Sequence, residues 1–173
     1  MRKILLVLSC IAAAAQAKSE FLVVSEDAIM STILLQDYRN KIKKFMEKFE
    51  ESKKAIEKKL RASRIALEKL KDKPEFAKKE AEWQKQVEAY ERKVAALSQA
   101  AEEATRDAGE KINSMINVIL ADISKKHESK PIFKEAALLY LPEGYTNVTG
   151  ELVDSMNKTH KTISVALPMV SLE

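Results

Sequence analysis

Apolar and small residues recur at alternating steps of three and four between residues 38 and 108. The first series occupies positions 38, 42, 45, 49, 52, 56, 60, 63, 67 and 70, and the second occupies positions 76, 80, 83, 87, 90, 94, 97, 101, 104 and 108, where Glu80 is the one charged member. This spacing places the residues along one side of a helix, as in a coiled coil. Pro74 lies between the two series. The pattern predicts two long helices joined near residue 73.

The two series fit together when they are paired antiparallel about residue 73. Large residues then face small ones, with Phe45 opposite Ala101 and Tyr38 opposite Ala108, which allows close packing without voids. We therefore predict an antiparallel helical hairpin, an arm formed by residues 28–108 and about 60 Å long. The contact line between its helices, the hairpin seam, is expected to include Tyr38, Phe45, Phe49, Trp83, Tyr90 and Leu97.

Glycine and proline are absent from residues 28–71, so the first helix is expected to run without interruption. The second is expected to run from Pro74 to about His127 and contains a single glycine, Gly109. A glycine inside a helix costs about 1 kcal/mol relative to alanine. Close packing is the simpler interpretation of Gly109, and a flexure between arm and body is the alternative.

Short apolar runs flank the arm at both ends of the chain. One consists of Phe21, Leu22, Val23 and Val24, and two more lie at residues 132–133 and 137–141, the latter including Leu138, Leu139 and Tyr140. Their length and composition predict buried strands. The fold is therefore expected to be α+β and mostly α, with a small β body formed by residues 18–27 and 109–160. Three short strands are marginal alone, so oligomerisation is expected. The residues expected in the oligomerisation strands are Phe21, Leu22, Val23, Val24, Leu138, Leu139 and Tyr140.

A short helix is expected at about residues 150–158, capped by Thr149, before a C-terminal tail at residues 161–173. In the tail Ile163, Val165, Leu167 and Met169 alternate with smaller residues. This alternation fits either an added edge strand or a loose terminus, and we favour the loose terminus.

Residues 1–17 have the features of a signal peptide. Arg2 and Lys3 precede an apolar run at residues 4–15, and Ala15-Gln16-Ala17 provides a small-x-small cleavage site. A lipoprotein acylated at Cys10 is the alternative that we disfavour, because its apolar run would be too short. Cleavage after Ala17 would remove the single cysteine and two of the 30 basic residues, leaving a net charge of 28 − 26 = +2. We expect an exported, periplasmic protein without thiol chemistry.

Residue patterns for catalysis or cofactor binding are missing from the sequence. The two histidines, His127 and His160, lack partners at metal-ligand spacing, and the three glycines are isolated. Acidic and basic residues alternate along the helices at i,i+4 spacing, which is typical of a solvated helix surface. The aromatic residues follow the seam rather than a stacking platform for nucleic acid. We therefore predict no enzyme activity, no metal, no cofactor and no nucleic-acid partner.

The order of the apolar runs, the hairpin and the last helix along the chain is also informative. Phe21-Leu22-Val23-Val24 precedes the hairpin, and Ala136-Ala137-Leu138-Leu139-Tyr140 follows it. A turn at residues 142–149 and a helical segment at 152–157, Leu-Val-Asp-Ser-Met-Asn, close the pattern. Over residues 18–158 this layout resembles the Skp/OmpH family of periplasmic chaperones. Ser25 and Asn147 depart from the aspartates often found in that family, and the tail is an extension.

The resemblance implies a homotrimer in which strands of three subunits form a β-barrel and three arms enclose a cavity. It also implies an ATP-independent holdase for unfolded outer-membrane proteins. The alternative is a structural coiled-coil envelope protein that binds lipopolysaccharide or an anionic membrane surface through basic faces of its arm. Since helix pairing uses the seam, clients are expected to contact residues off it.

Overall fold

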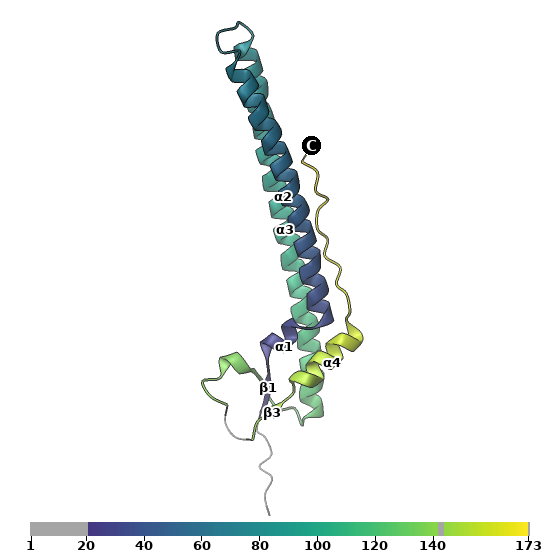
Figure 1. Cartoon of the computed structure of the whole chain (residues 1–173). Helices are drawn as coiled ribbons and strands as arrows, with labels where there is room; N and C mark the ends of the chain where they lie inside the picture. The colour runs from purple at the N-terminus through teal and green to yellow at the C-terminus, as the bar shows by residue number, and fades with distance from the viewer. Residues whose placement is uncertain (1–20, 142–143, 173) are drawn as a thin grey trace, which may run out of the picture.

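The computed structural model describes residues 21–141 and 144–172, so the predicted signal peptide at 1–17 lies outside the described residues. The two longest helices, α2 (Ile33–Glu68) and α3 (Phe76–Lys126), form an arm that stands on a small body (Figure 1). The body contains the following elements: β1 (Leu22–Val24), α1 (Glu26–Met30), β2 (Ile132–Lys134), the 3₁₀ helix η1 (Glu135–Ala137), β3 (Thr146–Asn147) and α4 (Thr149–Thr159). Within the described residues, no helix has an apolar stretch long enough to cross a membrane.

The predicted antiparallel hairpin is confirmed. Two side chains of α3 reach the backbone or a carboxylate of α2: Trp83 Nε1 donates to the Leu60 carbonyl at 3.1 Å, and the Tyr90 hydroxyl donates to Glu57 Oε1 at 2.9 Å. The tip lies between Glu68 and Phe76, where the sequence placed it. At 51 residues, α3 is longer than α2, which has 36, and its C-terminal part packs on α4 in the body.

The expectation of an uninterrupted first helix is wrong, because the chain turns at Ser31 and Thr32 between α1 and α2. The Ser31 hydroxyl donates to the Ala28 carbonyl at 2.7 Å, and Thr32 has an extended backbone (φ −63°, ψ 152°). The free Ile33 amide then donates to Asn157 Oδ1 of α4 at 2.9 Å. Serine and threonine compete with helical hydrogen bonds in this way, and a partner from α4 stabilises the break.

The small sheet is confirmed, with β1 in the centre and parallel neighbours in the order β2-β1-β3. Leu22 pairs with Ile132 on one side and with Thr146 on the other. Because β1 is flanked on both edges, its three residues are nearly inaccessible to solvent, at 0–2% exposure. The central strand therefore comes from the start of the chain and both outer strands from its last third.

The predicted strand at residues 137–141 is wrong. Glu135–Ala137 form η1, the Leu138 amide donates to the Glu135 carbonyl at 3.1 Å, and the chain bends at Leu139 and Tyr140. The place beside β1 is taken by Thr146–Asn147, and the Val148 amide donates to the Val23 carbonyl at 2.9 Å. The short connection from β3 to α4 favours Thr146–Asn147 as the strand beside β1, because Val148 between them is fully buried.

The start of α4 is held by residues other than the predicted cap. Asn147 Oδ1 accepts a hydrogen bond from the Thr149 amide at 2.9 Å, whereas the Thr149 hydroxyl accepts one from the Ser25 amide at 2.8 Å. Thr149 therefore ties α4 to the segment after β1 rather than capping its own helix. Leu152 and Met156 of α4 are fully buried in the body core. That core also contains Leu22, Val24, Ile29, Leu34, Ile112, Ile119, Ile123 and Ile163.

Candidate functional site

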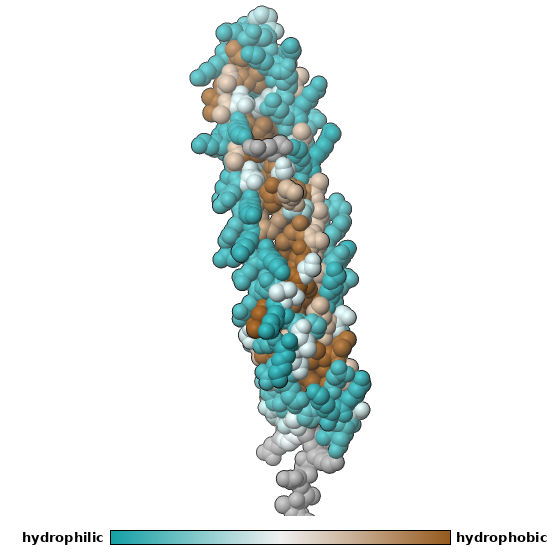
Figure 2. All heavy atoms as spheres, turned by 90° about the vertical axis from the view of Figure 1, so that its right-hand side faces the viewer, coloured by the Kyte–Doolittle hydropathy of each residue, from teal (hydrophilic) through white to brown (hydrophobic). Residues whose placement is uncertain are grey.

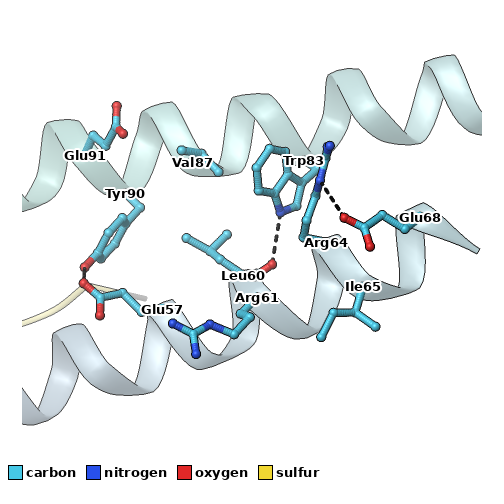
Figure 3. A pocket seen from close by; sticks show the side chains of 10 residues that line it. All are labelled: Glu57, Leu60, Arg61, Arg64, Ile65, Glu68, Trp83, Val87, Tyr90 and Glu91. Atoms are coloured by element: carbon cyan, nitrogen blue, oxygen red, sulfur yellow. Dashed lines mark hydrogen bonds and ion pairs between the residues drawn. The ribbon is translucent and has the colours of Figure 1, made fainter.

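The arm carries two apolar surfaces, one near its tip and one along its lower half. The first, which we call the distal groove, is a shallow hollow of about 460 Å³ between α2 and α3. Figure 3 shows Trp83 of α3 beside Leu60 of α2, with Arg64 next to the indole. Ten residues line the groove: Glu57, Leu60, Arg61, Arg64, Ile65, Glu68, Trp83, Val87, Tyr90 and Glu91.

Trp83 is fixed from two directions. Its indole nitrogen donates to the Leu60 carbonyl at 3.1 Å, and the Arg64 guanidinium carbon lies 5.0 Å from the ring centroid. Arg64 in turn approaches Glu80 across the hairpin at 3.5 Å and Glu68 on its own helix at 3.6 Å. A cation over an aromatic face is attracted by the ring quadrupole, so the groove wall is preorganised.

Tyr90 forms the lower boundary of the distal groove. Burial, together with the hydrogen bond to the Glu57 carboxylate, raises the pKa of Tyr90 to about 12. The neutral phenol is therefore a stable donor to Glu57 at physiological pH. This contact connects α3 to α2 between the two apolar surfaces.

The second surface is occupied by the C-terminal tail. Residues 161–172 form neither an edge strand nor a loose terminus but an extended segment that runs along the arm (Figure 1). Its anchor is Ile163, which is 3% exposed. The Ile163 amide donates to Asp37 Oδ2 at 3.1 Å, and its carbonyl accepts from Lys41 Nζ at 2.6 Å. Both backbone groups of one tail residue are therefore bound by α2.

Asp37 and Lys41 are also paired with each other, at 2.7 Å. The Lys41 hydrogen bond, with support from the Ile163 amide and the charge of Lys44, lowers the pKa of Asp37 although partial burial raises it. A carboxylate that accepts such bonds is favoured in its charged form. The anchor thus depends on the ionised state of Asp37.

Above the anchor, the tail lies on an aromatic cluster. Phe45 and Phe49 are 7% and 6% exposed, and their rings stack with centroids 5.9 Å apart. Leu172 is buried against them, and Leu167 and Val170 pack at their edges. We call the surface that holds residues 164–172 the tail groove; its lining from the arm includes Lys41, Ile42, Lys44, Phe45, Met46, Lys48, Phe49, Ala101 and Thr105. Figure 2 shows apolar side chains gathered along the middle of this face, with hydrophilic ones on both sides.

The six residues predicted for the hairpin seam are distributed over three places on the arm. Phe45 and Phe49 lie in the tail groove, where Tyr90 and Leu97 pack against the same cluster. Trp83 lies in the distal groove, and Tyr38 packs against the body core and donates to the Thr105 carbonyl at 3.4 Å. The roles of Asp37, Lys41 and Leu172 were not predicted from the sequence. The alternation of apolar and smaller residues in the tail indicates that one side of it is buried, but it does not indicate which surface the tail covers.

Gly109 lies within the continuous helix α3. A Cβ atom placed there would meet no atom within 4 Å, so close packing does not explain this glycine. The flexure interpretation stays a prediction.

The predicted oligomerisation residues occupy two different settings. Leu22, Val23 and Val24 are buried in the sheet, and the Phe21 ring packs edge-on against Phe133 at 5.7 Å. In contrast, Leu139 and Tyr140 are 104% and 76% exposed, and Leu138 is half-buried. In the part of the sheet that the structure describes, β2 and β3 each leave one edge unpaired. Among the described side chains, no group of three His, Cys, Asp or Glu is placed to hold a metal ion.

Comparison with protein-family models gave no match, and comparison with curated proteins gave none either. A crystal structure from Caulobacter crescentus CB15, named for an OmpH-like outer membrane chaperone, matches with a TM-score of 0.76 at 14% sequence identity. The match covers 91% of this chain and 95% of that chain, so it includes both the arm and the body. The chain therefore has an Skp/OmpH-like fold.

Proposed function

We propose that this protein is an ATP-independent holdase chaperone of the periplasm that binds unfolded outer-membrane proteins and prevents their aggregation. The observation that carries the proposal is the structural match over arm and body to a protein named as an outer membrane chaperone. In this reading the protein is a binding protein without catalytic residues or cofactor.

The surface of the arm supports this proposal. Several large apolar side chains remain accessible on α2 and α3, with Met46 at 46%, Ile65 at 53% and Val118 at 61% exposure. Charged residues surround them, so the arm combines apolar contact points with solubility. Many weak contacts of this kind suit a partner without fixed structure, and methionine adapts well to varied partners.

We further propose that the body assembles three copies of the chain into a homotrimer. Two unpaired sheet edges and the exposed residues Leu139, Tyr140 and Leu141 support this, because a small sheet with open edges is stabilised when the edges are covered. Leu139→Asp should shift the mass in solution from trimer to monomer. The charge costs the single subunit nothing in packing, since Leu139 is fully exposed there. Val118→Asp, an equivalent change on α3, should leave the trimer intact.

The function is tested by diluting a urea-unfolded outer-membrane β-barrel into buffer that contains the mature protein and no nucleotide. Light scattering should fall to the background level at about stoichiometric trimer. Unchanged aggregation at a tenfold excess of trimer would contradict a holdase.

A structural envelope protein is the second candidate, and one observation favours it. Lys44 and Lys48 line the tail groove, so this face can attract anionic headgroups. Co-sedimentation with vesicles that contain lipopolysaccharide or anionic lipid separates the two candidates. Salt-sensitive vesicle binding without protection of the unfolded barrel would favour the structural role.

A further inference from the structure

The tail shows that the arm can hold an extended polypeptide. Residues 161–172 are extended, and their one hydrogen-bonded anchor is Ile163 at the lower end. Within residues 164–172, as the structure describes them, the contacts with the arm are side-chain packing and not hydrogen bonds. Such a surface recognises the spacing of apolar side chains more than their identity.

The apolar side chains of the tail follow the two-residue period of a strand. Ile163, Val165 and Leu167 turn toward the arm, as expected for alternate residues of an extended chain. After Pro168 the phase changes, because Val170 and Leu172 turn inward while Met169 is 87% exposed. The groove therefore holds two phases of an alternating apolar pattern within one segment.

The groove retains space and charge beside the tail. A hollow of about 500 Å³ borders Leu167, and Met46 contributes a flexible wall that is 46% exposed. Lys44 and Lys48 line the tail groove beside the tail, whereas Lys41 is held by Asp37 and the Ile163 carbonyl. The charge of Lys44 and Lys48 favours a ligand that carries acidic residues at its solvent-facing positions. Strands of a membrane β-barrel have the required alternation of apolar and polar residues.

We propose that the tail groove is a binding site for extended client segments with alternating apolar residues, and that residues 164–172 occupy it in cis until a client displaces them. The inference rests on the proposed function, since it assigns a place on the arm to the clients of that function. A tethered segment competes at an effective concentration of the order of millimolar. The apparent client affinity is then lowered by the fraction of molecules with an empty groove.

The test releases residues 164–172 without changing the groove, and the Ile163 anchor is kept. The double variant L167N/L172N alters two side chains of the tail only, and it is made in the full mature chain. The matched control is Met169→Asn, which introduces the same uncharged polar group at an exposed tail position. The probe is a fluorescent peptide with the sequence of residues 164–172, and its binding is followed by anisotropy. We expect the double variant to bind the peptide about tenfold more tightly than the wild type and the control. Far-UV circular dichroism checks that the helices are retained.

A second variant locates the binding site. Met46→Asp places a charge on the groove wall at a position that tolerates it, and in the released background it should weaken peptide binding at least fivefold. A urea-unfolded outer-membrane β-barrel should displace the peptide from the released variant. Equal peptide affinity in wild type, control and double variant would overturn the inference, as would failure of the unfolded barrel to displace the peptide.

The aggregation assay with the wild type keeps the two proposals apart. If the wild type protects the unfolded barrel but tail release leaves peptide binding unchanged, only the present inference is overturned. If the released variant binds the peptide but neither protein protects the barrel, the holdase function fails and the client assignment fails with it.

Discussion

Trp83 provides a direct measure of how much the arm tip depends on cross-helix contacts. Truncation to alanine removes the hydrogen bond to the Leu60 carbonyl, the contact with the Arg64 guanidinium and the packing against α2. The hydrogen bond contributes about 1 kcal/mol and the cation–π contact about 0.5–1 kcal/mol. A fully buried tryptophan loses about 3–5 kcal/mol on truncation, but Trp83 is only half-buried, and alanine is the better helix former.

We therefore expect Trp83→Ala to lower the free energy of unfolding by about 2 kcal/mol, and Trp83→Phe by about 1 kcal/mol. Urea denaturation followed by circular dichroism at 222 nm measures the change. Ile65→Ala is the control, because Ile65 lines the same groove but is 53% exposed. Hydrogen exchange should increase around residues 57–68 and not in the body. A Trp83→Ala value within 0.5 kcal/mol of the control would refute this account of the tip.

Three further changes test other parts of the molecule. Gly109→Ala should raise stability by about 1 kcal/mol, since no atom obstructs the added methyl group; a loss of stability in thermal denaturation would mean that the site is constrained. Thr32→Val should be neutral or stabilising by up to about 1 kcal/mol in urea denaturation, because the buried Thr32 hydroxyl oxygen lacks a hydrogen-bond partner among the described residues; a loss above 1 kcal/mol would reveal a partner. Acid should release the tail: the pKa of Asp37 is lowered from 3.8, so its stabilisation is complete above pH 3.8 and disappears as the pH falls through the lowered value. Asp37→Asn should abolish that pH dependence in a fluorescence measurement of tail release, and an unchanged acid transition would show that another group controls it.

The hairpin could be predicted from the sequence because its information is local and repeated. Nearly every turn of α2 and α3 places an apolar or small residue on the same side, so the 3–4 spacing and Pro74 suffice to define two paired helices. The break before α2 could not be predicted in this way. Serine and threonine are tolerated in helices, and the partner of the Ile33 amide, Asn157, is 124 residues away.

The predictions for residues 137–141 and for the C-terminal tail were wrong for a related reason. Residues 137–141 have strand composition, but composition does not show which segment lies beside β1, and Thr146–Asn147 occupy that edge. The tail has strand alternation, but its partner is a surface assembled from α2 and α3 rather than a strand edge. Asp37 and Lys41 have ordinary i,i+4 spacing, so their role in holding Ile163 emerges only in three dimensions.

The central position of β1 has a consequence for the order of folding. The first strand of the described chain can complete its pairing only with segments that follow the entire arm, and the Ser25–Thr149 hydrogen bond spans 124 residues. Hairpin contacts near the tip, such as Trp83 with Leu60, span only 23. Contacts between distant residues form slowly because loop closure must come first. The amides of the arm are therefore expected to become protected from hydrogen exchange early in refolding. Those of β1 are expected to become protected later, after the C-terminal quarter of the chain has folded against them.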